Sequence, residues 1–286
     1  MARTLSFDLD CLSADLSSDD PAIVSAAVRG LSPRLGTLDD AAYERAVETL
    51  CSLFYVDTAD RPDLEAALDE ATTLLTGQGA RVVPHLLRQM RSSDIKSHLY
   101  LARTLGRIGT GALPALRDLL ATSEDRYARA FALYALGKMS CPEVARALPE
   151  VLGGLMHPDK EVRDSASRTI GRIAAAVPKH GLSPGRRREM FEALMRAIHD
   201  LEVPVRAKAM RSLGKMAAAG LLTRHQEKAV TAAARAALGE SPGFVWDHAY
   251  IVRREAGEAL QIVSRGRPVA ARASRPSVRQ QPPPAR

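Results

Sequence analysis

A ten-residue phrase recurs along this chain, and it constrains the fold more strongly than any other feature of the sequence. It opens with Val or Ala followed by Arg, carries Ala at its centre, and closes with Leu or Ile before Gly. Clear copies occupy residues 128–137, 162–171 and 205–214, and weaker copies occupy 97–106, 252–261 and 23–31. The closing Leu or Ile falls at positions 105, 136, 170, 213 and 260, so successive copies lie 31, 34, 43 and 47 residues apart. Such steps are typical of arrays in which each repeat is one pair of helices.

The phrase itself has the pattern of an amphipathic helix. In the copy that begins at residue 162, apolar residues recur at spacings of four, four and three, which places them on one helical stripe. These residues are Val162, Ala166, Ile170 and Ile173. An Asp precedes each copy, and Asp at a turn caps the free N–H groups at the start of a helix. These aspartates are Asp20, Asp94, Asp125, Asp159, Asp200 and Asp247.

Further helical segments lie between the phrases, separated by Gly and Pro. We expect first helices over residues 82–90, 113–120, 144–155, 186–198 and 226–238, and two more over 39–55 and 63–76. One helix pair cannot bury both of its faces, whereas stacked pairs share a continuous core. The sequence therefore predicts an all-α fold, an α-solenoid of stacked antiparallel helix pairs.

Charge divides the chain into three parts. Residues 1–79 hold 5 Lys and Arg against 15 Asp and Glu, a net charge of −10, whereas residues 80–263 hold 29 against 18, a net charge of +11. Residues 264–286 hold 6 Arg and no acid, with three consecutive prolines near the end. We expect an acidic N-terminal group of helices over 1–79, a repeat array over 80–263 and a disordered basic tail over 264–286.

The phrase resembles the HEAT repeat, especially the HEAT-like repeats also found in bacterial phycobilin lyases. The matching features are the Asp before the helix, the Val/Ala-Arg pair, the central Ala and the closing Leu/Ile-Gly. The resemblance covers residues 80–263 well and 1–79 loosely. It implies a curved superhelix whose second helices line the concave surface. It does not specify a function, because scaffolds, adaptors, lyases and DNA-repair enzymes all use this repeat.

Two columns of basic residues recur on the second helices, two positions before and two positions after the closing Leu or Ile. They comprise Arg103, Arg107, Lys138, Arg168, Arg172, Arg211 and Lys215, and Tyr134 and Glu258 interrupt them. Members of the two columns lie four residues apart on one helix face, so stacked repeats would align them as a stripe. A positive concave stripe attracts an acidic protein segment or a nucleic-acid backbone. The alternative is a solvated face that contributes only to solubility.

A separate arginine column follows the first residue of each phrase. The resemblance implies that these arginines pair with the preceding aspartates as a structural ladder between repeats, with His98 at the same place in another copy. The expected ladder comprises Asp94, Asp125, Arg129, Asp159, Arg163, Asp200, Arg206 and Arg253.

Two other local features each allow two interpretations. Trp246 with Asp247 resembles the site of HEAT-like alkylpurine DNA glycosylases, but a cap on the last repeat with a helix-start Asp explains the pair better. Arg186, Arg187 and Arg188 open a helix where positive charge is slightly unfavourable, which indicates either a solvated first turn or a contact with a partner.

No motif indicates catalysis, a metal site or a cofactor. The histidines and the cysteines Cys11, Cys51 and Cys141 lack metal-ligand spacing, and the sequence has no P-loop, G-x-S-x-G or G-x-G-x-x-G. We expect a cytoplasmic, non-catalytic scaffold or adaptor that binds an acidic segment of a protein partner along the concave face. The alternatives are a nucleic-acid-binding protein, including a HEAT-like glycosylase, and a chromophore lyase or chaperone.

Overall fold

The computed structural model describes residues 9–92, 95–242 and 246–265, and this part of the chain contains fourteen α-helices and no strand. The helices are α1 (Leu9–Leu16), α2 (Pro21–Leu35), α3 (Asp40–Ser52), α4 (Glu65–Gly77), α5 (Val83–Ser92), α6 (Ile95–Ile108), α7 (Leu113–Thr122), α8 (Arg126–Leu136), α9 (Leu148–Gly154), α10 (Lys160–Ala176), α11 (Pro184–Ala197), α12 (Val203–Ala218), α13 (Arg224–Leu238) and α14 (Tyr250–Arg265). The expected all-α architecture is confirmed. None of the described helices is long and apolar enough to cross a membrane.

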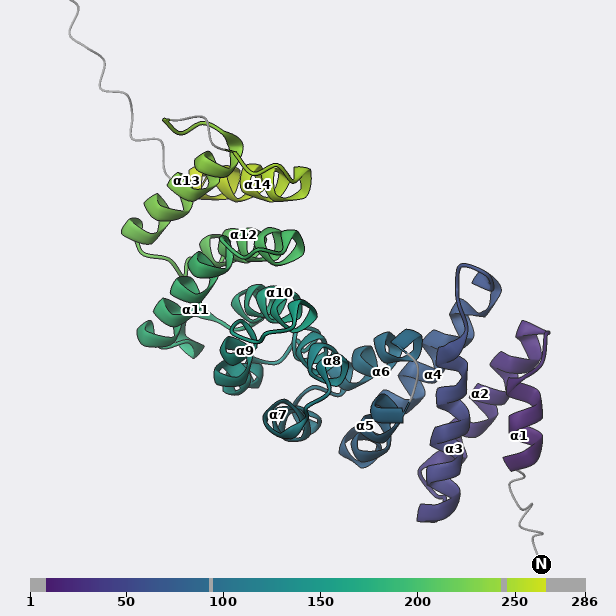
Figure 1. Ribbon diagram of the computed structural model, residues 1–286. Coiled ribbons are helices and arrows are strands. Elements are labelled where there is room, and N and C mark those ends of the chain that lie inside the picture. The colour runs from purple at the N-terminus through teal and green to yellow at the C-terminus, as the bar shows by residue number, and fades with distance from the viewer. Residues whose placement is uncertain (1–8, 93–94, 243–245, 266–286) are drawn as a thin grey trace, which may run out of the picture.

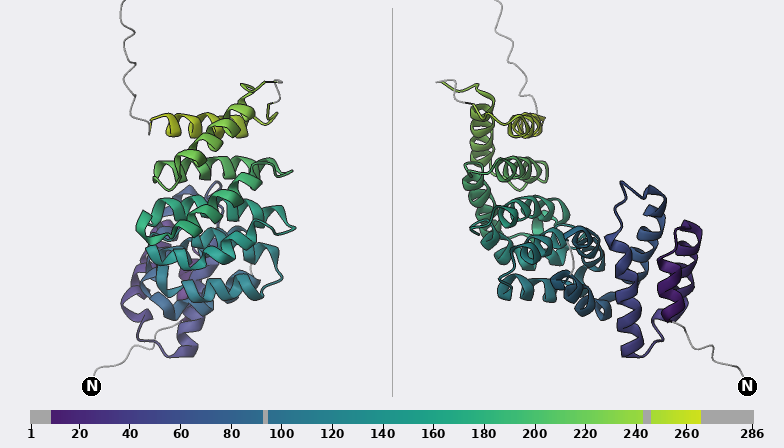
Figure 2. Two further views of the ribbon diagram at one scale, coloured as in Figure 1. Left: turned by 90° about the vertical axis from the view of Figure 1, so that its left-hand side faces the viewer. Right: turned by 45° about the vertical axis from the view of Figure 1, so that its right-hand side comes forward.

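Consecutive helices form seven pairs that stack into a bent row (Figure 1). Each even-numbered helix from α2 to α12 packs against the next even-numbered helix, and we call the even-numbered helices α2 to α14 the inner row. The odd-numbered helices form the outer row. Figure 1 and the right-hand view of Figure 2 show α6, α8, α10, α12 and α14 on the inner side of the bend. The predicted solenoid of stacked helix pairs is therefore present.

The aspartates that precede the phrases cap helices. Asp125 Oδ1 accepts a hydrogen bond from Tyr127 N at 2.8 Å, and Asp159 Oδ1 accepts one from Glu161 N at 2.9 Å. Asp20 caps α2 in the same way. Each carboxylate satisfies an N–H group that has no partner within its own helix, and its charge complements the helix dipole. Asp94 lies outside the described residues.

One apolar core runs through the stack. It extends from Leu12 in α1 to Val263 in α14, and the predicted stripe on α10 is buried within it. The helices expected over 39–55 and 63–76 correspond to α3 and α4, and α4 packs against α6 across the point where the charge changes sign. The stack therefore continues through residue 79. Of the expected tail, residues 266–286 lie outside the described part of the chain.

Four of the phrases close with a glycine, and each of these glycines lies where the next inner helix crosses closely. A Cβ atom on Gly171 would lie 2.3 Å from Ser212 Oγ and 3.0 Å from Ser212 Cα. Gly106, Gly137 and Gly214 face the next inner helix in the same way. Buried hydroxyls join the helices at this level, because Thr169 donates to Leu133 O at 2.8 Å and Ser212 donates to Ser167 O at 2.7 Å. The closing glycine is thus required for contact between adjacent repeats.

Candidate functional site

Two arginines of the expected ladder bridge successive repeats. Arg163 donates from Nε and Nη2 to the Asp200 carboxylate at 2.7 and 3.0 Å, and from Nη1 to the carbonyls of His157 and Pro158. Arg206 binds the Asp247 carboxylate at 2.7 and 3.1 Å in the same bidentate manner. The expectation that the carboxylate comes from the preceding Asp is wrong, because the following loop supplies it. The preceding loop supplies only backbone carbonyls.

The electrostatics of these pairs suit a structural role. Burial opposes the charged form of Asp200, but hydrogen bonds from Arg163 and from Glu202 N hold its pKa below the ordinary value. Burial likewise opposes the charged form of Asp247, but hydrogen bonds from Arg206 and from Ala249 N lower its pKa. Bidentate, partly buried pairs of this kind are stronger than exposed ion pairs and fix the angle between neighbouring helices.

The other ladder arginines bind backbone carbonyls. Arg129 donates to Ser123 O and Leu120 O at 3.1 and 2.8 Å, and it is the neighbouring Arg126 that reaches Asp159, at 3.3 Å. Arg253 donates to Asp247 O and His248 O. His98, at the corresponding position in α6, is buried edge-on against the ring of Phe131. The carboxylate bridges of this column are therefore confined to two steps among the described repeats.

Three members of the basic stripe have acidic neighbours. Arg103 lies 3.4 Å from Asp69, and Arg168 lies 3.6 Å from Asp164. Arg211 makes a bidentate contact with Glu255, whose side chain is only 1% exposed. Sequence reasoning missed Glu255, because 44 residues separate it from Arg211 and only the stacking of α12 on α14 brings them together.

Four members of the stripe have no such neighbour. Within the described ranges, no carboxylate lies at salt-bridge distance from Arg107, Lys138, Arg172 or Lys215. Lys138 and Arg172 line a common hollow of about 250 Å³ at the ends of α8 and α10. Burial lowers the pKa of Lys215, and the positive charges of Arg172, Arg211 and Arg168 lower it further. These cations are thus close enough to repel one another.

An aromatic ring lies among these cations. The ring centroid of Tyr134 is 5.1 Å from Lys138 Nζ and 6.0 Å from the guanidinium carbon of Arg168. We call Lys138, Arg168, Arg172 and Lys215, with Tyr134, the inner basic cluster. Its side chains come from α8 and the turn that follows it, from α10 and from α12. The cluster can accept carboxylates or phosphates by charge-assisted hydrogen bonds, with an aromatic face beside them.

Trp246 and Asp247, near the last helix, both make structural contacts. Trp246 packs against Gly239 and under the guanidinium of Arg253, 4.4 Å from its ring centroid, while 48% of Trp246 stays exposed. Both oxygens of Asp247 accept hydrogen bonds from Arg206, and Oδ1 also caps Ala249 N. Asp247 is therefore committed to joining repeats.

The buried cysteine of α3 is also a core residue. Burial raises the pKa of the Cys51 thiol to about 12, and the charge of Glu48 adds to this rise.

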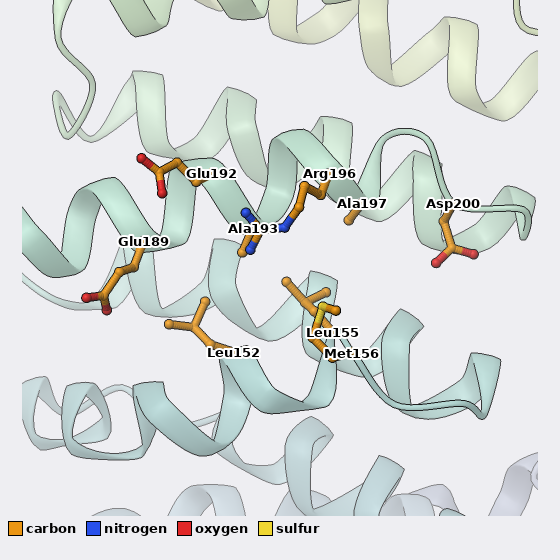
Figure 3. A pocket seen from close by; sticks show the side chains of 9 residues that line it. All are labelled: Leu152, Leu155, Met156, Glu189, Glu192, Ala193, Arg196, Ala197 and Asp200. Atoms are coloured by element: carbon orange, nitrogen blue, oxygen red, sulfur yellow. The ribbon is translucent and has the colours of Figure 1, made fainter.

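A groove on the outer row differs in character from the inner cluster (Figure 3). It encloses about 380 Å³ between α9 and α11. Leu152, Leu155 and Met156 form its apolar floor, and Glu189 and Glu192 lie at one end (Figure 3). Arg163 holds the carboxylate of Asp200 at the other end. The rim of this groove thus carries acidic residues together with Arg196 (Figure 3), and nothing in the sequence pattern singled the groove out.

Comparison with known proteins identifies the repeat type. Residues 83–171 match the family model for HEAT repeats, so this stretch consists of HEAT repeats. A search of curated proteins found no match to the chain.

Several solved structures are similar in fold. An engineered protein is 20% identical with a TM-score of 0.44, and the match covers 91% of this chain and 98% of that one. A designed armadillo repeat protein in complex with the peptide (KR)4 is 18% identical with a TM-score of 0.42, covering 90% of this chain and 100% of that one. Computationally designed armadillo repeat proteins for modular peptide recognition give 17% identity, a TM-score of 0.41 and coverage of 89% and 99%.

Proposed function

We propose that this HEAT-repeat chain is a non-catalytic scaffold or adaptor that binds an acidic segment of a partner protein along its inner row. The observation that carries the proposal is the inner basic cluster. Three successive repeats bring cations together there, and Lys138, Arg172 and Lys215 have no carboxylate of the described chain at salt-bridge distance.

The cost of gathering these charges supports a ligand of opposite sign. Like charges at short range disfavour each other, and burial together with three neighbouring arginines lowers the pKa of Lys215. Carboxylates placed among the cations would remove this repulsion. Arg168 and Arg172 can each bind a carboxylate with two parallel hydrogen bonds, and Tyr134 offers an apolar face for the rest of the segment.

The charge distribution favours a protein segment over duplex nucleic acid. The four cations of the cluster occupy only the middle of the row, whereas residues 1–79 carry a net charge of −10. On α4 the carboxylate of Asp69 is exposed, although Arg103 lies beside it. A long phosphate backbone would meet repulsion at this end of the row, whereas a short acidic peptide would not.

The non-catalytic part of the proposal rests on two observations. The sequence carries no nucleotide-binding or hydrolase motif. Asp247, the residue that a glycosylase would need beside Trp246, is held by Arg206. The phycobilin-lyase form of the repeat stays a prediction, since the match to the HEAT-repeat model does not distinguish this subtype.

The test is titration of the full chain with a fluorescent peptide of ten glutamates. In the triple variant that combines Lys138→Glu, Arg172→Glu and Lys215→Glu, the Kd for the peptide should rise at least about a hundredfold. The reason is that charged hydrogen bonds contribute about 1.5–3 kcal/mol each. The matched control reverses Arg146, Lys160 and Lys228, three exposed cations outside the cluster with the same total charge change.

Equal weakening in both triple variants would show attraction by net charge alone and would refute the proposal. A parallel titration uses labelled duplex DNA. Tighter binding of the duplex, lost in the same cluster variant and steeply dependent on salt, would replace the proposal with nucleic-acid binding.

A further inference from the structure

A second positively charged site lies on the outer row. A pocket of about 840 Å³ opens between the N-terminal ends of α11 and α13. Its polar lining includes Lys179, Arg187, Arg188 and His225. Residues 186–188 are the arginine run noted in the sequence, which the proposed function does not use. The pocket is lined by α11, α13 and the segments that precede them, whereas the inner basic cluster lies along the even-numbered helices.

Positive charge in this pocket is poorly compensated. Glu192 is the one carboxylate among its lining residues, and it lies 3.7 Å from Arg188. Because these two side chains are 52% and 72% exposed, solvent screens the pair strongly. The Nε atom of Arg187 is buried and has no hydrogen-bond partner among the described residues. A buried donor without a partner is costly, and it adds to the uncompensated polar groups in the wall of this pocket.

The run of arginines does not serve the helix that contains it. The first turn of α11 holds no acidic residue, and the positive charges of the arginines are unfavourable beside the positive end of the helix dipole. Arg186 Nη1 donates a hydrogen bond to Ala145 O at 3.1 Å. The other two arginines of the run, Arg187 and Arg188, line the pocket. The N-terminal end of α13, capped by Thr223, lies on the opposite wall. All these charges and dipoles favour an anion.

The remaining walls are apolar. Phe191, Leu221 and Leu222 line the pocket together with Pro184. An inorganic anion would leave these side chains facing water, whereas an organic group attached to the anion would cover them. Lys179, Arg187 and Arg188 supply three fixed positive charges, which match an anion carrying two or three negative charges. Guanidinium groups recognise phosphate oxygens through paired hydrogen bonds.

We propose that this pocket binds a small organic diphosphate, with the phosphates between Lys179, Arg187 and Arg188 and the organic part against Phe191 and Leu222. The probe is adenosine diphosphate, titrated into the full chain by calorimetry at physiological salt. Saturable binding with one site is expected. Inorganic pyrophosphate should bind at least about tenfold more weakly, because it covers none of the apolar wall.

The variant Lys179→Gln, Arg187→Gln, Arg188→Gln should raise the Kd for adenosine diphosphate at least about tenfold. The control Arg146→Gln, Lys160→Gln, Lys228→Gln removes the same charge elsewhere and should leave the Kd unchanged. Thermal unfolding of both variants checks that the fold is intact. Arg187→Lys keeps the charge but removes the paired donors, so it should raise the Kd by less than the triple variant does. It also provides the test if the triple variant unfolds.

No heat of binding up to millimolar diphosphate, or an equal loss in the control variant, would overturn the proposal. Equal affinity for pyrophosphate and adenosine diphosphate would overturn the role of the apolar wall. The acidic-peptide test of the inner row uses other residues and another probe, so the two proposals can fail separately.

Discussion

The close crossing at Gly171 makes a sharp prediction about stability. In Gly171→Ala the new methyl carbon would lie 2.3 Å from Ser212 Oγ, 2.8 Å from Ser212 Cβ and 3.0 Å from Ser212 Cα. A different rotamer would move only the hydroxyl, so α10 and α12 must separate. Overpacking of this kind costs about 1–3 kcal/mol. Displacing the buried Ser212 hydroxyl from Ser167 O costs about 1 kcal/mol more.

A gain in helix propensity offsets part of this cost. Replacing Gly by Ala inside a helix stabilises it by about 1 kcal/mol. The net expectation is a fall of about 1–3 kcal/mol in the free energy of unfolding, measured by urea denaturation followed by circular dichroism. Gly257→Ala is the matched control, because Gly257 lies inside α14 with no atom within 4 Å of its added Cβ. Gly257→Ala should be neutral or stabilising.

A double-mutant cycle tests the cause. Ser212→Gly removes both the hydroxyl and the Cβ that the new methyl group would meet, so it should recover part of the loss in Gly171→Ala. The two changes should therefore be non-additive by more than about 0.5 kcal/mol. If Gly171→Ala is as stable as the wild type, or if the two changes are simply additive, then the crossing is not as close as the structure shows and the explanation of the closing glycine is wrong.

Three further predictions concern charged groups. The lowered pKa of Asp200 means that its stabilisation is complete at neutral pH and is lost as pH falls from the ordinary value of 3.8 through the folded value. Asp200→Asn should therefore reduce neutral-pH stability by about 1.5–3 kcal/mol and flatten its acid dependence, as measured by urea denaturation at several pH values. Because the pKa of Lys215 is lowered, the midpoint of its acylation against pH, followed by mass spectrometry, should lie below 10.5 and rise when the glutamate peptide is bound. Glu255→Gln weakens the hold on Arg211 and should destabilise the chain while tightening peptide binding, as measured by denaturation and titration. Looser peptide binding would contradict the place of Arg211 beside the cluster.

The sequence was sufficient for the fold because each repeat encodes it locally. The apolar stripe on α10, the Asp caps and the breakers all depend on residues a few positions apart, and the expected helices match the observed ones. The need for glycine at 171 could not be derived in this way, since it arises from Ser212 on the next repeat. The recurrence of glycine after Leu105, Leu136, Ile170 and Leu213 was the only available signal.

The candidate site was less predictable because it depends on which carboxylates reach which arginines. Asp200 and Asp247 lie 37 and 41 residues after their arginine partners, and the variable repeat length hides these pairings in the sequence. The basic stripe was visible as two columns, but its division into neutralised and available members was not.

The same residue type therefore serves two purposes in this chain, and the decisive factor is what the following repeat provides. Where the next loop presents Asp200, Arg163 becomes a structural bridge between repeats. Where the next inner helix presents the buried Glu255, Arg211 is held against α14. Arg172 faces the positive charge of Lys215 on the next helix rather than an acid, so its charge stays available on the inner row. Placing a carboxylate at position 215, as in Lys215→Glu, should convert Arg172 into another bridge. Stability should then rise by about 0.2–1 kcal/mol, as expected for a partly exposed pair, while affinity for the glutamate peptide falls. A loss of stability in this variant would show that repulsion among the cations is not what makes the cluster costly.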